Sequence, residues 1–285
     1  MTESISFWES WFVWRDAVIV SLIAAAALSY LGVWVVLKRV VYVPLALSQV
    51  SSVGVVTAFL VCDLCGHGEH GTGIVGVLLD PSWTSLLFAG LASAWFATAR
   101  AHSSNATVVA YLLSAAAVLV MGGFIRQDLH DVQSLLFGHA VLVETIQIIY
   151  VGSAAFIVLV VHSLFYRRFL SVSYDPDSAG ALGIRSLQHD ILLYLTLGMM
   201  ISIATRAIGA LPAFGFAIFP ALAGLRIGRS MRAAFLVAIM VGVLSAGLGY
   251  YLSFVWELPT GASMVGLAGG LYLLSAAISR LGRAK

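Results

Sequence analysis

Residues 17–37 read AVIVSLIAAAALSYLGVWVVL, an uninterrupted apolar run that is closed by Lys38 and Arg39. A helix needs about 20 apolar residues to cross the hydrocarbon core of a bilayer, and this run is long enough. Similar runs follow along the chain, and they lack the two-residue alternation of membrane barrels. The sequence therefore predicts an all-α, polytopic transmembrane helical bundle that forms a single domain over residues 1–285.

The overall composition excludes a soluble fold. Hydrophobic residues make up 61% of the chain and charged residues only 10%, whereas a soluble domain carries about 25% charged residues. The 27 glycines suit close contacts between helices in lipid. We expect eight or nine spans, at about 17–37, 45–61, 84–99, 107–123, 145–165, 190–205, 208–225, 233–254 and 262–278.

Basic residues are distributed unevenly between the two sides of the predicted bundle. If the spans alternate in direction, Arg15, Arg126 and Arg206 lie on one side and the other 12 of the 15 basic residues lie on the opposite side. The positive-inside rule makes the richer side cytoplasmic. The sequence thus predicts an outer N-terminus, a cytoplasmic C-terminus and a plasma-membrane (inner-membrane) location.

The chain has no nucleotide-binding motif of its own. Its only lysines are Lys38 and Lys285, and neither belongs to the G-x-x-x-x-G-K-[ST] loop that binds nucleotide phosphates. We therefore expect no enzymatic activity, and any ATP hydrolysis that drives transport must take place in another chain.

The largest cytoplasmic connection, 166–189, contains signals for a short helix. Asp175 is a good N-cap, Pro176 suits the first helical position, and Gly183 suits the residue that ends a helix. Such a helix is either a rigid knob for a cytoplasmic partner or an ordinary interfacial turn. His162 lies near the same end of its span, where we expect its ring to reach the lipid headgroups.

Several blocks resemble the zinc- and manganese-type ABC permeases of the ABC-3 family. Asp175, Pro176, Asp177, Ala179 and Gly183 resemble the D-p-e-x-A-x-x-x-G run of that family. Four further blocks agree in their order along the chain: Leu31-Gly32-Val33 through Lys38-Arg39, Leu136-Phe137-Gly138, Gly209-Ala210 through Pro220-Ala221, and Leu258-Pro259-Thr260-Gly261-Ala262.

The resemblance implies a permease subunit of an ATP-driven importer for a divalent metal ion, zinc or manganese. It implies a homodimer in lipid, a cytoplasmic ABC ATPase and a periplasmic or lipoprotein metal-binding protein as partners. The helix after Asp175 would be the coupling helix that docks on the ATPase. The resemblance implies no permanently bound cofactor and no nucleic-acid partner.

The second predicted span departs from the family pattern. Members of the family usually carry Gly-Asp-Ala-x-x-His there, and residues four apart share one helix face. The aligned run here is Pro44-Leu45-Ala46-Leu47-Ser48-Gln49, so Leu45 replaces the acid and Gln49 replaces the histidine. An amide oxygen is a poor zinc ligand, which puts the usual metal gate in question.

The outer loop at about 62–73 offers other metal ligands. Cys62, Cys65, His67 and His70 form a C-x-x-C and an H-x-x-H pair, and zinc favours tetrahedral cysteine and histidine sets. Three interpretations stay open: transient metal capture, a disulfide between the cysteines, or no role. A weaker outer cluster, Asp128, His130 and Asp131, receives metal, contacts a binding protein or is a solvated loop face.

Two other functions compete with the metal permease. One is a divergent permease for a non-metal solute, consistent with Leu45 and Gln49. The other is a stand-alone secondary transporter, a class that usually places an ionisable residue near the midplane of the membrane. No charged residue lies well inside a predicted span, which counts against ion-coupled transport.

Overall fold

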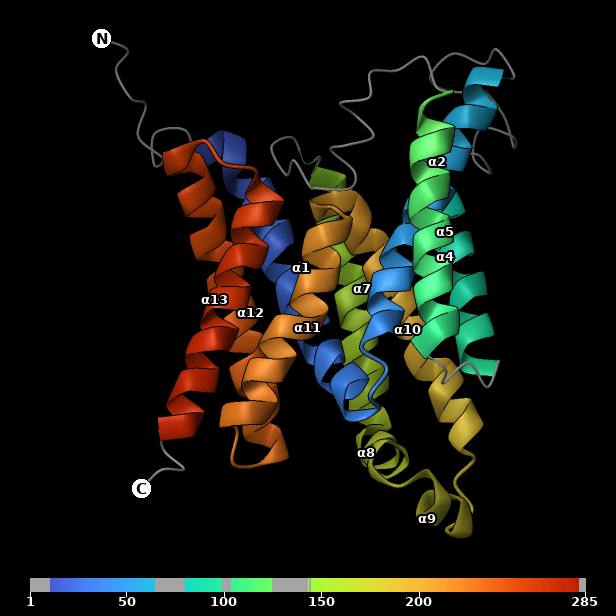
Figure 1. Ribbon diagram of the computed structural model, residues 1–285, viewed down its shortest axis with the longest axis vertical. Helices are drawn as coiled ribbons and strands as arrows, with labels where there is room; N and C mark the ends of the chain where they lie inside the picture. The colour runs from blue at the N-terminus through green and yellow to red at the C-terminus, as the bar shows by residue number, and fades with distance from the viewer. Residues whose placement is uncertain (1–10, 65–79, 99–103, 125–142, 144, 282–285) are drawn as a thin grey trace.

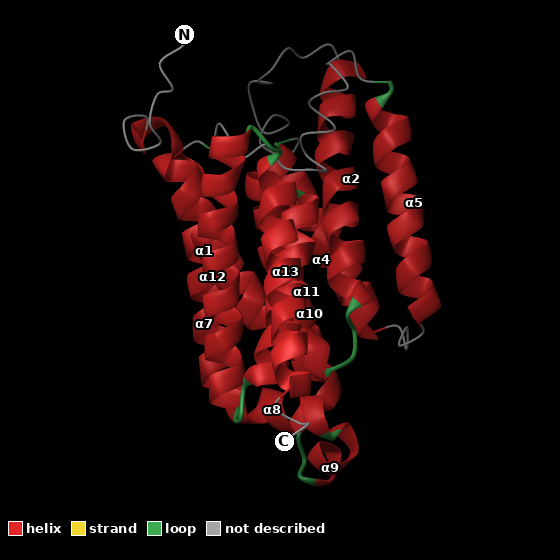
Figure 2. Ribbon diagram, turned by 60° about the vertical axis from the view of Figure 1, so that its left-hand side comes forward, coloured by secondary structure: helices red, strands yellow, loops and turns green. Residues whose placement is uncertain are grey.

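The computed structural model describes residues 11–64, 80–98, 104–124, 143 and 145–281. Within these residues every regular element is a helix, and nine long helices run side by side (Figures 1 and 2). They are α1 (Trp11–Leu37), α2 (Tyr42–Leu64), α4 (Pro81–Thr98), α5 (Ser104–Gly122), α7 (Thr145–Leu164), α10 (Ser186–Ile208), α11 (Ala210–Ile227), α12 (Met231–Trp256) and α13 (Thr260–Leu281). Each coincides with a predicted segment, so the all-α bundle is confirmed.

Eight of these nine helices are long and apolar enough to cross a membrane. The exception is α4, in which Ser82, Thr84, Ser85 and Ser93 lower the hydropathy. It nevertheless packs against α2 and α10 inside the bundle. The expected number of eight or nine spans is therefore confirmed, and the polar character of α4 explains the difference between the two counts.

The core of the bundle is built around α10 and α1. Helix α10 contacts α1, α2, α4, α7 and α11, while α1 also packs on α11 and α12. Leu28, Leu31 and Phe216 are fully buried in this core. Many large apolar side chains face outward instead, among them Leu113 on α5, Phe156 on α7 and others. An apolar exterior of this kind fits a surface that lies in lipid.

Small residues bring the core helices into backbone contact. A Cβ atom on Gly32 of α1 would lie 2.0 Å from the carbonyl oxygen of Ala217 on α11. A Cβ atom on Gly198 of α10 would lie 2.0 Å from the Ser93 hydroxyl oxygen on α4. These helices can pack so closely only because glycine has no side chain, as is common where helices associate in lipid.

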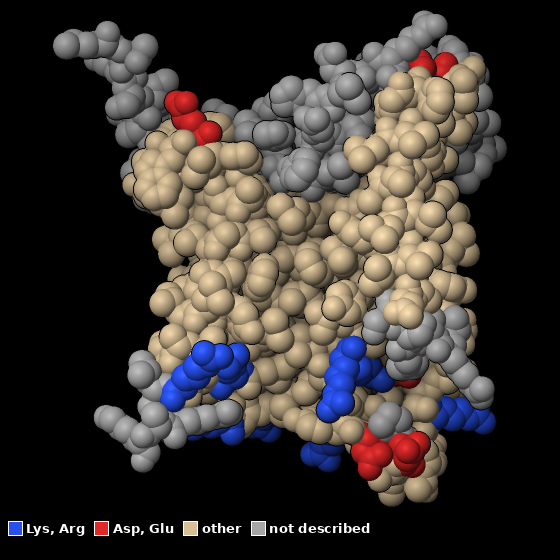
Figure 3. Space-filling view, viewed as in Figure 1, with Lys and Arg blue, Asp and Glu red and all other residues tan. Residues whose placement is uncertain are grey.

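Charge is concentrated at the two ends of the bundle. Figure 3 shows lysine and arginine side chains gathered at the end where the C-terminus lies. Two short helices, α8 (Tyr166–Tyr174) and α9 (Pro176–Ala181), project from that same end (Figure 1). They belong to the connection between α7 and α10, so the 166–189 loop predicted from sequence is an ordered two-helix unit.

Candidate functional site

Asp175 joins the two short helices and caps the second. It is the C-cap of α8 and the N-cap of α9. Its carboxylate accepts hydrogen bonds from the backbone N–H groups of Asp177 (3.2 Å) and Ser178 (3.1 Å) and from the Ser178 hydroxyl. Pro176 holds the first helical position, where its missing N–H costs nothing. The predicted cap geometry is confirmed.

Gly183 ends the unit in a left-handed conformation, with φ +77°. Its N–H donates to the Gly180 carbonyl oxygen at 3.0 Å, and the Ile184 N–H donates to the Ala179 carbonyl oxygen at 3.0 Å. The two bonds close the last turn, and only glycine adopts this φ without strain. The position predicted to end the helix is confirmed. Ala179, whose carbonyl accepts one of these bonds, is itself almost fully buried, so α9 is held both by its closing turn and by packing.

Aromatic packing anchors α8 to the bundle. Phe169 of α8 is fully buried and contacts Trp34 of α1. The His162 ring of α7 stacks on Phe169, with centroids 4.5 Å apart and planes 5° apart. The His189 ring of α10 packs edge-on against Phe169 from another side. The unit is therefore joined to three helices of the core.

The expectation for His162 was wrong. Its side chain is fully buried, and its Nε2 lies 2.9 Å from the Thr196 hydroxyl oxygen. That hydroxyl donates to the Leu192 carbonyl oxygen, so it accepts the Nε2–H of the histidine. A hydrogen bond inside the bundle replaces the expected contact with headgroups.

An ion pair joins α10 to α1 just above the short helices. The ammonium group of Lys38, directly after α1, contacts the Asp190 carboxylate near the start of α10. Only 9% of the Lys38 side chain and 19% of the Asp190 side chain are exposed. Because a largely buried charge needs its partner, this pair fixes the inner end of α10 against α1.

Leu45 and Gln49 lie on α2 with both side chains half-buried. The Gln49 side-chain oxygen is buried and has no hydrogen-bond donor within the described part of the chain. Two residues further on, the Ser51 hydroxyl donates to the Ser202 hydroxyl of α10 at 3.1 Å. The α2 position that departs from the family pattern thus holds a polar but uncharged group.

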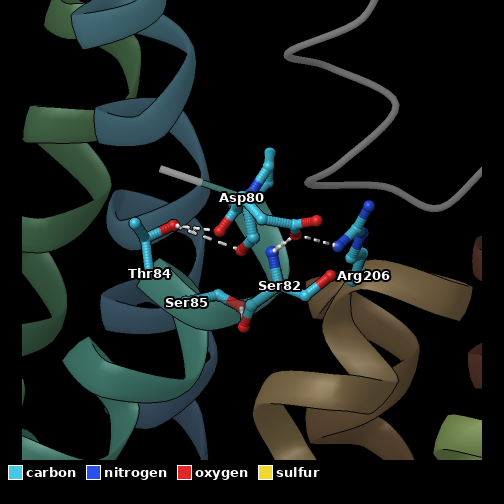
Figure 4. A network of polar contacts seen from close by, with 6 residues as sticks. Asp80, Ser82, Thr84, Ser85 and Arg206 are labelled. Carbon is cyan, nitrogen blue, oxygen red and sulfur yellow. Dashed lines mark hydrogen bonds and ion pairs between the residues drawn. The ribbon is translucent and has the colours of Figure 1, made fainter. Parts of the chain in front are cut away.

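A pocket of about 300 Å³ opens between α4, α7 and α10 at the end opposite α8 and α9. Asp80 and Arg206 stand at this pocket, with one guanidinium nitrogen 3.3 Å from the carboxylate. The same carboxylate oxygen accepts the Ser82 backbone N–H at 2.7 Å. Figure 4 shows the contacts that the Asp80 carboxylate makes with both Ser82 and Arg206. Ser202, the partner of Ser51, also lines the pocket, so the pocket reaches the α2–α10 contact.

The outer-loop residues are only partly described. Cys62 lies half-buried in the last turns of α2. Cys65, His67, His70, Asp128, His130 and Asp131 lie outside the described residues. No group of three or more histidine, cysteine or acidic side chains suited to a metal ion occurs in the described residues.

The sequence pattern of the ABC 3 transport family matches residues 11–279. The chain belongs to the ABC 3 transport family. This match confirms the resemblance inferred from the ordered motifs, and it runs from the start of α1 through α8 and α9 into the last turn of α13.

Characterised proteins similar to this ABC 3 chain include metal transporters. The manganese transport system membrane protein MntC of Halalkalibacterium halodurans is 24% identical over 262 residues, covering 92% of this chain and 85% of that protein. The high-affinity zinc uptake system membrane protein ZnuB of Haemophilus influenzae is 25% identical over 260 residues, covering 90% and 93%. The structure of PsaBC from Streptococcus pneumoniae superposes with a TM-score of 0.79 at 19% identity, covering 94% of each chain.

Three features of this ABC 3 chain were missed in the sequence. They are the helix α8 and the two ion pairs, Lys38–Asp190 and Asp80–Arg206. The sequence does contain a local pattern that predicts α8. Its buried residues Phe169, Val172 and Ser173 are three and four positions apart, which is helical spacing. The ion pairs join residues 152 and 126 positions apart, which a local pattern does not reveal.

Proposed function

We propose that this chain is the permease subunit of an ATP-binding-cassette importer for a divalent metal ion, manganese or zinc. The observation that carries the proposal is the capped unit α8–α9 in a chain of the ABC 3 transport family. ATP is hydrolysed by a separate cytoplasmic ATPase subunit, for which α9 provides the docking element. The permease itself catalyses no reaction.

The orientation in the membrane follows from the charges. The end that carries α8 and α9 also carries most of the arginines and lysines (Figure 3), and such an end faces the cytoplasm. The chain therefore has an outer N-terminus and a cytoplasmic C-terminus in the plasma membrane. A second copy of the chain, lipid and an outer metal-binding protein complete the assembly, and nucleic acid has no part in it.

The exposed face of α8–α9 fits a docking role. Tyr174 and Leu182 are 64% and 76% exposed, and Asp177 is also exposed. Apolar side chains that remain uncovered on an ordered projection suit a protein partner. Behind them, Phe169 connects the unit to α1 and α10, and the Lys38–Asp190 pair joins these two helices to each other. A displacement of α9 is therefore transmitted to the core of the bundle through the contacts of Phe169 with α1 and α10.

Removing the Asp175 cap should weaken this coupling. We expect Asp175→Ala to lower cargo-stimulated ATP hydrolysis several-fold, because α9 loses the acceptor of its first N–H groups. Asp175→Asn is the matched control, since asparagine keeps a capping oxygen. ATPase rates of the reconstituted complex give the result; equal rates for the alanine variant and the wild type would contradict the role of the cap.

The cap should also be insensitive to pH near neutrality. Hydrogen bonds from the Ser178 hydroxyl and from the backbone N–H groups of Ser178 and Asp177 lower the pKa of Asp175. A carboxyl with a lowered pKa stabilises the folded state above its unfolded pKa, which is about 4. That contribution is lost only as the pH falls through the folded pKa. Asp175 thus stays ionised between about pH 5 and pH 8, and its cap makes coupling no different across that range.

The metal cargo is supported by the names of the two relatives, one a manganese and one a zinc system. The outer loop supplies the softest ligands of the chain, at Cys62, Cys65, His67 and His70. We infer that this loop captures metal transiently before it enters the permease. No cofactor is bound permanently, since the metal is cargo.

Changing the loop ligands should slow metal entry. We expect Cys62→Ser, Cys65→Ser, His67→Ala and His70→Ala together to reduce zinc uptake into vesicles several-fold at limiting metal, because capture is lost. Uptake at saturating metal should change little. A control in which only the two cysteines are changed separates a disulfide from a metal site. Unchanged uptake at limiting metal would remove the loop from the pathway.

A permease for another solute is the second candidate, favoured by Leu45 and Gln49. These two positions of α2 hold no carboxylate or imidazole, whereas the family usually carries both there. The metal content of cells tests the two functions. Deleting the gene should lower cellular manganese or zinc in depleted medium, and restoring the wild-type chain should recover it. Unchanged metal content, with ATPase activity intact in the complex, would favour the other solute.

A further inference from the structure

The pocket between α4, α7 and α10 has the composition of a site for a hard cation. Asp80 provides a carboxylate, and Ser82, Ser85 and Ser202 provide hydroxyl oxygens on the same lining. The volume of about 300 Å³ leaves room for an ion that retains several waters. Carboxylate, carbonyl, hydroxyl and water oxygens suit manganese or magnesium better than zinc, which favours nitrogen and sulfur.

Gln147 supplies an independent sign of a ligand. It belongs to the first turn of α7 and lines the pocket. Its side-chain oxygen is buried, and no group of the described residues donates a hydrogen bond to it. Buried acceptors in folded proteins are nearly always paired. Because this oxygen is covered in the conformation shown, the Gln147 amide would have to turn toward the pocket before a cation or its bound water could provide the missing partner.

Arg206 currently neutralises the carboxylate. The two charges meet through a single contact of 3.3 Å, with 36% of the Arg206 side chain and 45% of the Asp80 side chain exposed. An ion pair this exposed stabilises the protein little, so a doubly charged ion can compete for Asp80. The other hydrogen bond of the Asp80 carboxylate, from the Ser82 N–H, holds the carboxylate in place when the arginine leaves.

Arg206 also lies at the outer end of α10, the helix whose inner end contacts the α8–α9 unit. Arg206 is in the last turn of α10, and Asp190 near the start of the same helix pairs with Lys38. Between them α10 is one continuous helix. A displacement of its inner end is therefore passed to Arg206, which would alter the competition for Asp80.

We propose that this outer pocket is an entry site for the divalent cation, in which Asp80 binds the ion and Arg206 takes its place when the ion is absent. The site rests on the proposed function, because it takes the same cargo, but it uses residues outside the α2 positions and the Cys/His loop. Its oxygen ligands make it a site that prefers manganese to zinc. Gln147 and Ser202 complete the oxygen set.

Two single substitutions with opposite effects test the site. We expect Asp80→Asn to weaken Mn²⁺ binding about tenfold, since the carboxylate is lost, and Arg206→Gln to strengthen it severalfold, since the competing charge is removed. Mn²⁺ binding to the purified permease–ATPase complex is measured from the electron paramagnetic resonance signal of the free ion, in a background that lacks the four loop ligands. Asparagine preserves the cap on α4, so folding should be kept.

A purely structural ion pair gives a different pattern. Both variants would then change binding in the same direction, and the exchange Asp80→Arg with Arg206→Asp would restore it; that result would overturn the proposal. Equal binding in all variants would also overturn it. If Asp80→Asn does not fold, Gln147→Leu replaces it and should weaken binding too. Wild-type Mn²⁺ uptake, measured in parallel, distinguishes failure of this site from failure of the metal permease.

Discussion

Gly183→Val is expected to reduce cargo-stimulated ATP hydrolysis and uptake at least tenfold while the protein still inserts into the membrane. Gly183 has φ +77°, a conformation that a β-branched residue adopts only with strain. Among the described residues, no neighbouring atom lies within 4 Å of the Cβ that a substitution would add. The effect would thus come from the backbone alone, by unwinding the turn that closes α9.

Gly183→Asn provides the matched control for this change. Asparagine tolerates the left-handed conformation better than other residues that carry a Cβ. We expect its activity to stay within about twofold of the wild type, because the two closing hydrogen bonds at Gly183 and Ile184 are retained. Uptake and ATPase rates of both variants should be compared at equal amounts of inserted protein. Equal activity of the valine and asparagine variants would show that the shape of α9 is unimportant.

Gly32→Val is expected to disrupt the bundle itself. The added Cβ would lie 2.0 Å from the Ala217 carbonyl oxygen and 3.1 Å from the Ala221 Cβ. Both atoms belong to α11, so α1 and α11 would have to separate. Overpacking a close contact costs about 1–3 kcal/mol, and a clash with backbone belongs at or above the upper end. We expect little folded, monodisperse protein after extraction in detergent.

Gly152→Val on α7 is the control for this second change. A Cβ there meets no atom of the described part of the chain within 4 Å, while the cost of valine in a helix is the same at both positions. The yield and Tm of the two variants, followed by size-exclusion chromatography after heating, give the comparison. A Tm for Gly32→Val equal to that for Gly152→Val would contradict the packing described for α1 and α11.

Local signals were sufficient for the helices and for the capped turn. The apolar runs predicted all nine long helices, and Asp175, Pro176 and Gly183 occupy the expected cap positions. Each of these features depends on residues that are close in sequence, where hydrophobicity, side-chain hydrogen bonding and backbone freedom act directly.

Long-range contacts could not be predicted in the same way. His162 is buried because Thr196, 34 residues away, accepts its hydrogen bond. The pairs Lys38–Asp190 and Asp80–Arg206 join still more distant positions. Each of these charges lies near an end of a helix, and nothing in the local sequence marks it as one of a pair. Only the packing of α10 between its neighbours brings the partners together.

The two ends of α10 connect the proposed steps of transport. Its inner end contacts the α8–α9 unit and Lys38, and its outer end carries Arg206 at the cation pocket. The close contact at Gly198 holds the middle of α10 against α4, the helix that begins directly after Asp80. Docking of the ATPase at the inner end and cation binding at the outer end would thus act on the same helix, α10.

The most direct test is uptake of Mn²⁺ and Zn²⁺ into vesicles that contain the permease together with its ATPase and metal-binding protein. We predict metal accumulation that requires ATP hydrolysis, stops with a non-hydrolysable analogue and falls at least tenfold with Gly183→Val. Accumulation that is equal without ATP or without the ATPase would contradict an ATP-driven permease and would favour a transporter that works alone.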